Sequence, residues 1–540
     1  MAGAFASRAE DGRKAAAVFL TLTCQAIALA TDWPQYRGPT LDGITPDPIS
    51  VNWPSNGPSV VWTNMTLTNG FSTFAVSQGR AFVLISRKDA GGNLLEYCVG
   101  LDAATGASLW ATPIGAELWD PDFTGDGGAG TAPYYKGDGP RTTPSVSGSR
   151  VVSMSEQLNL VCMNAVNGSV VWSNNLFSAF GASSIAWDNA ASPCVDNDLV
   201  FVNLNSSTNN QTLVAFRMAD GSLAWSSQFE RVTHTTPIVA TIQGVRQVIF
   251  ATQTGLVSLN PTTGALLWKY NYPFGQIYTS MGASPIVYSN IVYCSAAYFK
   301  GAAAVQVGLN NGAWSLTQLY YKTAANYRSI WMSPVCYQGY VYSLSGENST
   351  YLTAPLNCIE LTTGELKWTT DNFGMGGLIL VNTNLLILTE DGQLILADPN
   401  PNAYTERARY RAFQFSASTP GKCWISPAYS NGRIYAHSTI GGICLDVSVA
   451  SVLSPLKFFP PRFLNSTTLE LLFGTADGTP LDSSRLPGIE VRATNSLSEP
   501  FSTWPRLTSP LELTTDGLAR LTNTITPGEG RRFYRAVEPR

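Results

Sequence analysis

The sequence is poor in charge, in histidine and in paired cysteines, and each shortage excludes a class of function. Asp, Glu, Lys and Arg make up 13% of the 540 residues, and the formal net charge of −4 leaves no basic surface for a nucleic acid. The two histidines, His234 and His437, are too few for a histidine-rich metal centre. The nine cysteines include no adjacent pair, no CxxC and no CxxCH, so neither a zinc site nor a covalently attached haem is predicted.

Long hydrophobic runs are also scarce, and the clearest one lies near the amino terminus. Residues 15–30, AAAVFLTLTCQAIALA, follow Arg13 and Lys14 and end in Ala-Leu-Ala. This run is shorter than the roughly 20 apolar residues of a membrane span, and its order of charge, apolar core and small residues is typical of a signal peptide. We therefore expect a signal peptide at residues 1–30, a mature chain without a transmembrane segment, and a periplasmic or secreted protein.

Glycine and proline are plentiful, at 47 and 32, and one phrase containing glycine recurs. Residues 101–110 read LDAATGASLW, and similar strings return as MNAVNGSVVW, FRMADGSLAW, LNPTTGALLW and IELTTGELKW. Each phrase predicts a strand, a tight turn in which glycine adopts a positive φ, and a second strand that carries tryptophan. A degenerate copy, LNNGAWSLTQLY, has Gly312 and Leu316 at the glycine and tryptophan positions.

The period of about 48 residues predicts a β-propeller of eight four-stranded blades over residues 31–450. The last repeat, near Leu445, lacks its final strand, and residues 59–62 supply one, so we expect amino- and carboxyl-terminal strands to close the ring. A single blade cannot bury both of its faces, and an indole wedged between blades would cover them. The predicted blade-docking residues are Trp62, Trp110, Trp172, Trp225, Trp268 and Trp368.

A second motif begins each blade, as in RTTPSV, AASPCV, HTTPIV, GASPIV, WMSPVC and WISPAY. Proline cannot donate a ladder hydrogen bond, so it fits the first residue of the innermost strand, and the Ser or Thr before it can satisfy local backbone groups. Residues just upstream should then ring one mouth of the central channel. The candidate ligand-binding residues there are Arg141, Trp187, Asp188, His234, Tyr278, Arg328, Trp331 and Trp424. They would hold a carbonyl-rich ligand or an extended peptide, or else simply plug the channel.

Chemistry beyond binding has little support in the sequence. The loop DPDFTGDGG offers Asp120, Asp122 and Asp126 as weak calcium ligands, but Thr131 stands where a carboxylate would complete an EF-hand-like pattern. A solvated loop is the alternative. No Ser-His-Asp arrangement, catalytic pair of carboxylates or phosphate-binding loop is recognisable, so no catalytic residue is predicted.

Residues 456–540 depart from the repeat after Pro455. TTLELLFG, GIEVRAT, PLELTTD, LARLTNT and RRFYRAV indicate short strands separated by turns, which predicts a small β-sandwich. FSTWPRL and RRFYRAV also resemble the fibronectin-like β modules that end many exported bacterial proteins. An inert cap or spacer and a surface-attachment or sorting role are both open for this module.

Residues 32–447 resemble a known family. The Gly-Trp phrase, with DWPQYRGP, GPRTTPSV and CWISPAYSNGRIY, is similar to secreted bacterial members of the pyrroloquinoline-quinone-like (PQQ-like) β-propeller repeat superfamily. This resemblance implies the eight-bladed fold of quinoprotein alcohol dehydrogenases, a superfamily that also contains cofactor-free scaffold propellers. The enzyme branch would show an adjacent-cysteine ring, a Glu/Asn/Asp calcium set and often CxxCH, and none is recognisable here. PQQ has three carboxylates and would need several cations, of which the channel mouth offers mainly Arg141, Arg328 and His234.

These observations favour an exported, non-catalytic binding or scaffold protein without a cofactor. We expect a monomeric propeller that presents its channel-mouth loops to a protein or polysaccharide of the cell envelope. The alternative is a PQQ- or calcium-dependent oxidoreductase of the quinoprotein dehydrogenase type.

Overall fold

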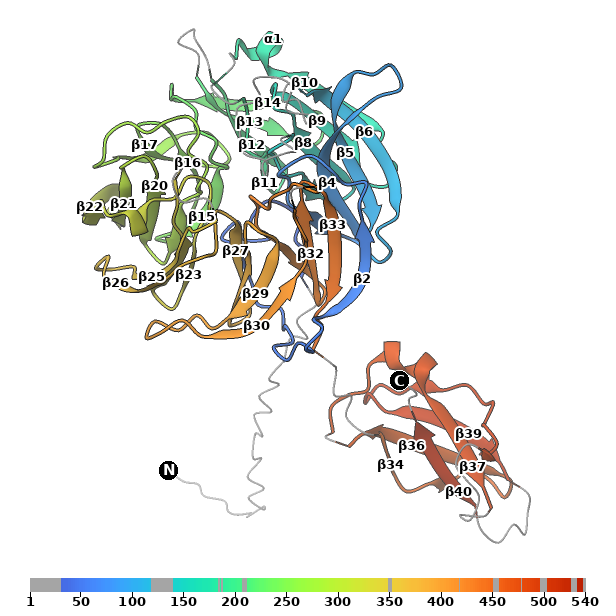
Figure 1. Cartoon of the computed structure of the whole chain (residues 1–540). Coiled ribbons are helices and arrows are strands. Elements are labelled where there is room, and N and C mark those ends of the chain that lie inside the picture. Colours follow the sequence, from blue (N-terminus) through green and yellow to red (C-terminus); the bar gives the residue numbers. More distant parts are fainter. Residues whose placement is uncertain are drawn as a thin grey trace, which may run out of the picture. The chain divides into compact units, whose positions relative to one another are not determined.

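A computed structural model describes residues 31–117, 139–182, 185, 188–205, 211–347, 352–416, 418–449, 456–476, 478–495, 503–525 and 532–537 (Figure 1). The predicted signal peptide at residues 1–30 lies outside these ranges. The chain divides into two compact units, Met1–Val449 and Ala450–Arg540. Within the described ranges, no helix has the length and hydropathy that crossing a membrane requires.

The described residues of the first unit form eight sheets, each built around four antiparallel strands. The first contains β3 (Ala75–Ser77), β4 (Arg80–Lys88), β5 (Leu94–Asp102) and β6 (Ser108–Ala116). Three more follow in chain order: β7–β10 (Ser145–Ser147, Arg150–Met154, Asn159–Asn164, Val170–Asn175), β11–β14 (Cys194–Asp196, Leu199–Asn203, Leu213–Arg217, Leu223–Ser227) and β15–β18 (Ile238–Ile242, Val245–Ala251, Gly255–Leu259, Leu266–Asn271).

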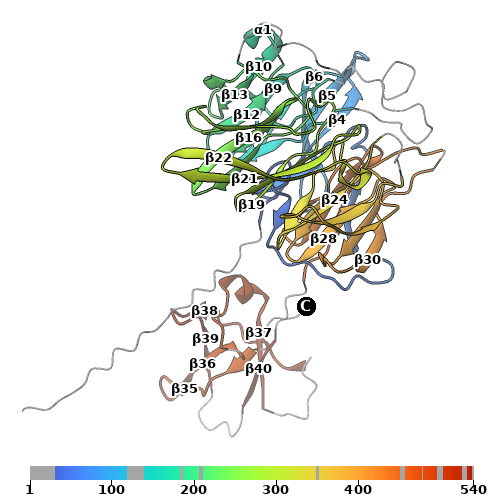
Figure 2. The ribbon, with the colours of Figure 1, turned by 90° about the vertical axis from the view of Figure 1, so that its left-hand side faces the viewer.

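The next three sheets repeat this order, and a few short helices and one extra strand are added to the unit. They are β19–β22 (Ile286–Tyr288, Ile291–Ala296, Gly301–Asn310, Ala313–Lys322), β23–β26 (Val335–Tyr337, Tyr340–Leu344, Leu356–Glu360, Leu366–Thr370) and β27–β30 (Gly377–Val381, Asn384–Leu388, Gln393–Ala397, Glu406–Arg411). The helix α1 (Leu176–Phe180) follows β10, the 3₁₀ helix η1 (Ala325–Tyr327) precedes β23, and β1 (Ile44–Thr45) adds to β27 in parallel. In the turned view of Figure 2, neighbouring sheets such as β11–β14, β15–β18 and β19–β22 lie face against face.

The eighth sheet joins distant parts of the sequence. It consists of β31 (Ala428–Ser430), β32 (Arg433–Ser438), β33 (Gly441–Asp446) and β2 (Ser59–Asn64). Val60 pairs with Leu445 and Trp62 with Cys444, as we expected for these segments. The short strands β3, β7, β11, β15, β19, β23, β27 and β31 are innermost, and β31 contacts β3, so the last sheet lies beside the first. The all-β propeller fold expected from the repeats is confirmed.

An aromatic ring from one sheet lies on a glycine of the next, and this contact explains the recurring phrase. The Trp62 indole donates to the Ala103 carbonyl oxygen at 3.1 Å, and its ring covers Gly106 so closely that a Cβ atom there would lie 2.5 Å from it. Gly106 also has a φ of 70°, which disfavours any other residue. The same arrangement joins Trp110 to Gly168, Trp172 to Gly221 and Trp225 to Gly264.

The degenerate repeat uses a different residue from the one that its sequence suggests. The hairpin of β21 and β22 is ten residues long in each strand, so its tip extends past the neighbouring sheets. A Cβ atom added to Gly312 at this tip would meet no other atom within 4 Å among the described residues. Leu316 is therefore not the docking residue. Tyr320, further along β22, packs on Gly364 of the following sheet instead. Among the glycines that the structure describes, none has a Cβ position that meets the Trp268 ring, and the Trp268 indole donates to Gln247 Oε1 at 2.7 Å within its own sheet.

Around the rest of the ring, the predicted pattern is kept in altered form. The Trp368 indole donates to the Asn400 carbonyl oxygen at 2.8 Å. In β30, Ala408 stands at the register position of the tryptophans, and Tyr410, two residues further on, places its ring against Gly57, just before β2. The aromatic-on-glycine contact therefore also supports the sheet that combines the two ends of the unit.

Side-chain hydroxyl groups of the residues just before the recurring prolines link neighbouring sheets. We expected them to satisfy local backbone groups instead. The Thr143 N–H donates to Ser192 Oγ at 2.8 Å, and the Ser192 N–H donates to Thr236 Oγ1 at 3.0 Å. On another part of the ring, the Ser284 N–H donates to Ser333 Oγ at 2.9 Å. A residue before proline is held extended, so its side chain reaches sideways to the adjacent strand.

The second unit has its own core. One sheet has the order β34 (Leu456–Phe458), β36 (Thr468–Thr475), β39 (Ala519–Thr524), β38 (Glu512–Leu513), with β35 (Arg462–Phe463) also paired to β36. The other pairs β37 (Glu490–Thr494) with β40 (Phe533–Val537), and the 3₁₀ helix η2 (Ser483–Gly488) precedes β37. Buried Phe473, Val491 and Leu521 belong to one cluster that draws on both sheets. The fibronectin-like identity of this unit stays a prediction.

Replacing Trp225 or its glycine partner should destabilise the propeller. Trp225→Ala leaves a cavity between two sheets and should cost about 3–5 kcal/mol in the free energy of unfolding. Gly264→Ala places a methyl group 2.7 Å from the indole, whereas Gly244→Ala has a similar φ but no atom within 4 Å among the described residues. Guanidinium denaturation should therefore show a larger loss for Gly264→Ala than for the Gly244→Ala control, and equal losses would contradict the docking role.

The hydroxyl links can be tested at Ser192. Ser192→Ala leaves the buried Thr143 N–H without its acceptor and should cost about 1–3 kcal/mol of unfolding free energy. Ser192→Thr should recover most of this, because threonine takes the equivalent position at Thr143 and Thr236. An alanine variant as stable as the original protein in the same denaturation experiment would rule the link out as a stabilising contact.

The cysteines of the propeller should be inert toward alkylation while it is folded. The described cysteines are all free and buried, and burial raises the pKa of the Cys98 thiol to about 12 and that of Cys162 to about 11. Since the thiolate is the reactive form, its fraction at pH 8 is minute and grows only as the pH rises toward these pKa values. Mass spectrometry after iodoacetamide treatment at pH 8 should show labelling only with denaturant; rapid labelling of native Cys98 would contradict this.

Candidate functional site

The channel is crossed by the segment that precedes the first sheet, residues 31–47. Gln35 exchanges two hydrogen bonds with the Val195 backbone in β11, its Nε2 donating at 3.1 Å and its Oε1 accepting at 2.9 Å. Buried Arg37 donates through Nη2 to the Pro334 carbonyl oxygen, just before β23, at 2.7 Å. Because β1 then pairs with β27, this segment is linked to the innermost strands of three sheets or to the residue just before them.

A cavity of about 230 Å³ lies against this segment, with Tyr36 in its wall. Every one of the innermost strands among the described residues is preceded by at least one residue that lines it. The lining residues are Tyr36, Phe71, Arg141, Thr143, Ala190, Ser192, His234, Thr236, Ser280, Gly282, Tyr298, Ile330, Trp331, Met332, Gly376, Trp424, Ile425 and Ser426. The segments that precede the innermost strands therefore form the cavity together, and they bring aromatic, hydroxyl and cationic groups from distant sequence positions into one place.

One wall of the cavity is aromatic and rigidly held. Trp424 stacks on Phe71 with a centroid distance of 5.3 Å, and Trp331 lies 4.6 Å from Trp424 at a tilt of 41°. The Trp424 indole donates to Glu390 Oε1 at 3.0 Å, and the Trp331 indole donates to the Met375 carbonyl oxygen at 3.0 Å. Since both indole N–H groups are engaged, the ring planes are fixed before any ligand arrives.

The ammonium group of Lys422 lies against this aromatic wall. Lys422 is only 1% exposed, and its Nζ lies 3.7 Å from the Trp424 ring centroid and 5.1 Å from that of Phe71. Cation–π attraction of this kind stabilises both the ammonium and the ring arrangement.

Exposed aromatic residues continue from the cavity to the surface. Tyr278 is 61% exposed and meets Tyr298, a lining residue, edge to face at 5.5 Å. Phe299 is 78% exposed, with the Arg328 guanidinium 5.0 Å from its ring centroid. Tyr298 and Phe299 both have positive φ values, 53° and 66°, which aromatic residues rarely adopt and which cluster at functional sites.

The structure brings together half of the predicted ligand-binding residues. Arg141, His234, Trp331 and Trp424 line the cavity, and Tyr278 lies at its rim. Arg328 is beyond the lining and forms an ion pair with Glu347 at 3.0 Å. Asp188 is half-buried with a φ of 49° and also lies beyond the lining, and Trp187 falls outside the described residues.

Three aromatic lining residues escaped the sequence analysis. Phe71 precedes β3, where the motif reads FSTFAV and lacks the proline that marks the other innermost strands. Tyr36 belongs to DWPQYRGP, a segment that carried a family resemblance but no predicted place in the channel. Tyr298 follows β20, at the opposite end of a strand from the motif, so its only signal is the exposed-looking pair Tyr298-Phe299 in a turn.

The residues around the cavity do not fit the quinone that the fold family implies. A tricarboxylate would be matched by several converging cations, yet Arg141 and His234 are the basic groups among the described lining residues. A calcium ion beside a quinone would need oxygen ligands, and the described lining includes no carboxylate or side-chain amide. The weak calcium candidates Asp120, Asp122 and Asp126 lie outside the described residues. No reaction step through a quinone is derived for this cavity.

Comparison with protein families gives one match. Residues 96–322 match a family described as outer membrane protein assembly factor BamB. This range begins in β5 and ends with β22, so it covers four of the five Gly-Trp phrases and the degenerate copy that follows them. No curated protein matches the sequence.

Several solved structures share the architecture at low sequence identity. A quinohemoprotein alcohol dehydrogenase from Comamonas testosteroni is 13% identical, with 76% of this chain and 77% of that chain covered and a TM-score of 0.51. BamB from Moraxella catarrhalis is 14% identical over 72% of this chain and 96% of its own, with a TM-score of 0.48. The quinohemoprotein alcohol dehydrogenase ADHIIG from Pseudomonas putida HK5 is 11% identical, covers 82% and 76%, and gives a TM-score of 0.49. The sheets, the docking contacts and the match over residues 96–322 agree in supporting a β-propeller of the PQQ-like type for this chain.

Proposed function

We propose that this chain is an exported, non-catalytic binding protein that holds an extended segment of a protein partner at its channel mouth. The observation that carries this proposal is the set of aromatic residues in the cavity wall, Trp331, Trp424 and Tyr298, together with exposed Tyr278, which meets Tyr298, and exposed Phe299 next to it in the chain. Large exposed aromatics beside an arginine are the residues that dominate protein interfaces.

The dimensions favour a peptide segment over a whole domain or a large cofactor. A volume of about 230 Å³ is below the usual range of small-molecule pockets, about 300–1,000 Å³, and suits one or two side chains of a loop that passes over the rim. Because the indole planes are already fixed by Glu390 and Met375, little side-chain entropy is lost on binding.

A polypeptide also fits the available hydrogen-bonding groups better than a polysaccharide does. A sugar presents many hydroxyls that need partners, whereas the hydroxyls of Thr143, Ser192 and Thr236 already accept hydrogen bonds from neighbouring sheets. An aromatic or aliphatic side chain needs no such partners, and the Arg141 guanidinium is suited to a carbonyl or carboxylate of the same segment. The match to a family named for outer-membrane protein assembly supports a protein partner and a periplasmic location.

Peptide selection on the purified chain tests this proposal. Random twelve-residue peptides displayed on phage should yield binders, and Tyr278→Ala and Trp424→Ala should each weaken the binding of a selected synthetic peptide about 5- to 30-fold. The matched controls are Tyr288→Ala, a tyrosine 40% exposed in β19, and Trp314→Ala, on the outermost strand β22. Both should bind as the original protein does, as measured by fluorescence anisotropy.

Other outcomes would replace the proposal. Selected peptides that bind Tyr278→Ala and Trp424→Ala at full strength would place their site elsewhere on the chain. Binding of defined glycans but of no peptide would favour the polysaccharide partner. A stoichiometric chromophore after reconstitution with PQQ and calcium, together with dye-reducing activity on alcohols or sugars, would establish the alternative, a quinoprotein-type oxidoreductase.

A further inference from the structure

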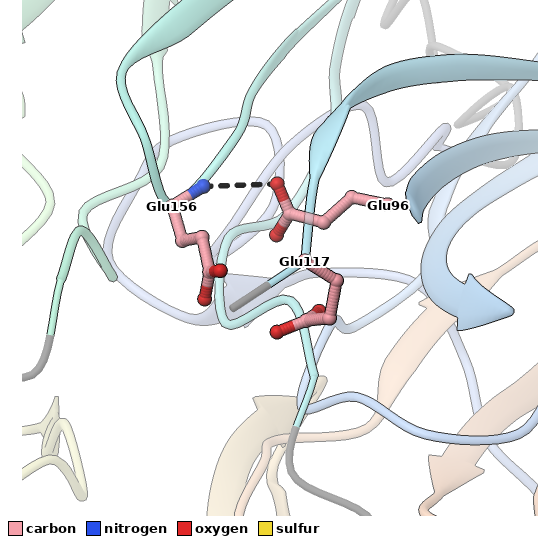
Figure 3. Close-up of side chains that lie close together, drawn as sticks. All are labelled: Glu96, Glu117 and Glu156. Carbon is pink, nitrogen blue, oxygen red and sulfur yellow. Dashed lines mark hydrogen bonds between the residues drawn. The ribbon is translucent and has the colours of Figure 1, made fainter. Parts of the chain in front are cut away.

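Three buried glutamates converge between the first two sheets of the propeller. Glu96 lies in β5, Glu117 directly follows β6, and Glu156 follows β8. Figure 3 shows their side chains pointing toward one another, and their carboxylate oxygens lie within 4.8 Å of each other. The exposed fractions are 1% for Glu96, 6% for Glu117 and 2% for Glu156. The cluster is thus separate from the channel cavity, whose described lining contains no carboxylate.

Ionised carboxyl groups are costly at this depth. The Glu156 N–H donates to Glu96 Oε2 at 3.0 Å, which supplies a partial positive charge. Arg141 is a cation that acts on Glu96. Carboxylates buried this close together also repel one another, and the burial of charge is unfavourable unless an opposite charge lies beside it. Burial, reinforced by Glu117 and Glu156, raises the pKa of the Glu96 carboxyl well above its usual range.

A buried serine on the same face provides a second, independent sign of a ligand. Ser86 pairs directly with Glu96 in the ladder of β4 and β5, so the two side chains project from the same face as neighbours. Leu84 and Cys98, the preceding pair on that face, pack against Val151 of the second sheet, which places this face toward Glu156. The Ser86 hydroxyl is fully buried and has no hydrogen-bond partner among the described residues. A buried hydroxyl of this kind calls for an oxygen-bound ion or its water.

We infer that Glu96, Glu117 and Glu156, with the Ser86 hydroxyl beside them, form a binding site for one calcium ion between the first two sheets. A divalent ion held by the three carboxylates would offset their mutual repulsion. The ion would tie β5 and β6 of one sheet to the end of β8 in the next, and so reinforce the contact that Trp110 makes with Gly168 between the same sheets.

The burial of the cluster favours calcium over magnesium. Ligands on opposite sides of a calcium ion, at 2.3–2.6 Å from it, are about 4.6–5.2 Å apart, so oxygens that all lie within 4.8 Å of one another can share one calcium ion. Magnesium binds at 2.0–2.1 Å, retains several waters and demands a near-octahedral set, and this requires a tighter and wetter site. Carboxylate and hydroxyl oxygens are in either case ligands for a hard cation rather than for zinc or copper.

Calcium titration of the chelator-treated full chain tests this assignment. Isothermal titration calorimetry should show one calcium ion bound per chain, and saturating calcium should raise the unfolding temperature by about 2–5 °C, with magnesium much less effective. Glu96→Gln and Glu156→Gln should each weaken calcium binding at least tenfold. Asp220→Asn, which removes an exposed carboxylate from the β13–β14 hairpin, is the charge-matched control and should bind as the original protein does.

The stability of the calcium-free variants separates loss of the site from loss of the fold. Because glutamine keeps the shape and removes like-charge repulsion, calcium-free Glu96→Gln should unfold at the same temperature as the calcium-free original protein or higher. Ser86→Ala, which leaves all three carboxylates in place, should also weaken calcium binding. Absence of calcium binding up to millimolar concentration would overturn the inference. Binding that survives both glutamate substitutions would do the same, since the ion would then lie elsewhere, for example near Asp120, Asp122 and Asp126.

Discussion

The placement of an aromatic ring from one sheet on a glycine of the next is the contact on which this propeller depends. A four-stranded sheet has two apolar faces and can bury neither alone, so its stability comes from its neighbours. At Gly106 two requirements coincide, because the turn needs a positive φ and the Trp62 ring leaves no space for a Cβ atom. The indole N–H then completes the contact by donating to the Ala103 carbonyl oxygen in the same turn. One ring thus orients the hairpin of the following sheet as well as covering it.

The geometry of the channel mouth follows from this arrangement of the sheets. Docking fixes the relative positions of the sheets, and the hydroxyl links from Thr143 to Ser192 and on to Thr236 then join their innermost strands edge to edge. The segment with Gln35 and Arg37 is anchored to the innermost strands by hydrogen bonds, and Tyr36 between them forms part of the cavity wall. The residues just before the innermost strands carry no docking contact themselves, so aromatic and cationic side chains can gather there without weakening the ring.

The sequence was sufficient for the features that repeat and insufficient for those that occur once. The Gly-Trp phrase predicted the hairpins, and the missing strand near Leu445 predicted its pairing with the residues around Trp62. The assignment of Leu316 to the tryptophan position was wrong. The long β21–β22 hairpin moves the docking position to Tyr320, and no local sequence pattern reveals the length of that hairpin. The path of Tyr36 across the channel depends on contacts with residues some 160 and 300 positions away, such as Val195 and Ser333, and no pattern in a single sequence predicts such pairs.

The two sites differ in how they relate to the docking contacts, and this difference separates their effects. The aromatic cavity is built on strand ends, so a partner bound there contacts preformed rings and leaves the sheet-to-sheet contacts unchanged. The glutamate cluster lies within an interface between sheets, where any change in its charge acts directly on the stability of the ring. Arg141 lies between them, since it lines the cavity and also acts on Glu96. Neutralising the cluster would therefore leave the guanidinium charge less compensated and more available to a ligand in the cavity, so a cation held in the interface would couple the stability of the propeller to the charge of its binding site.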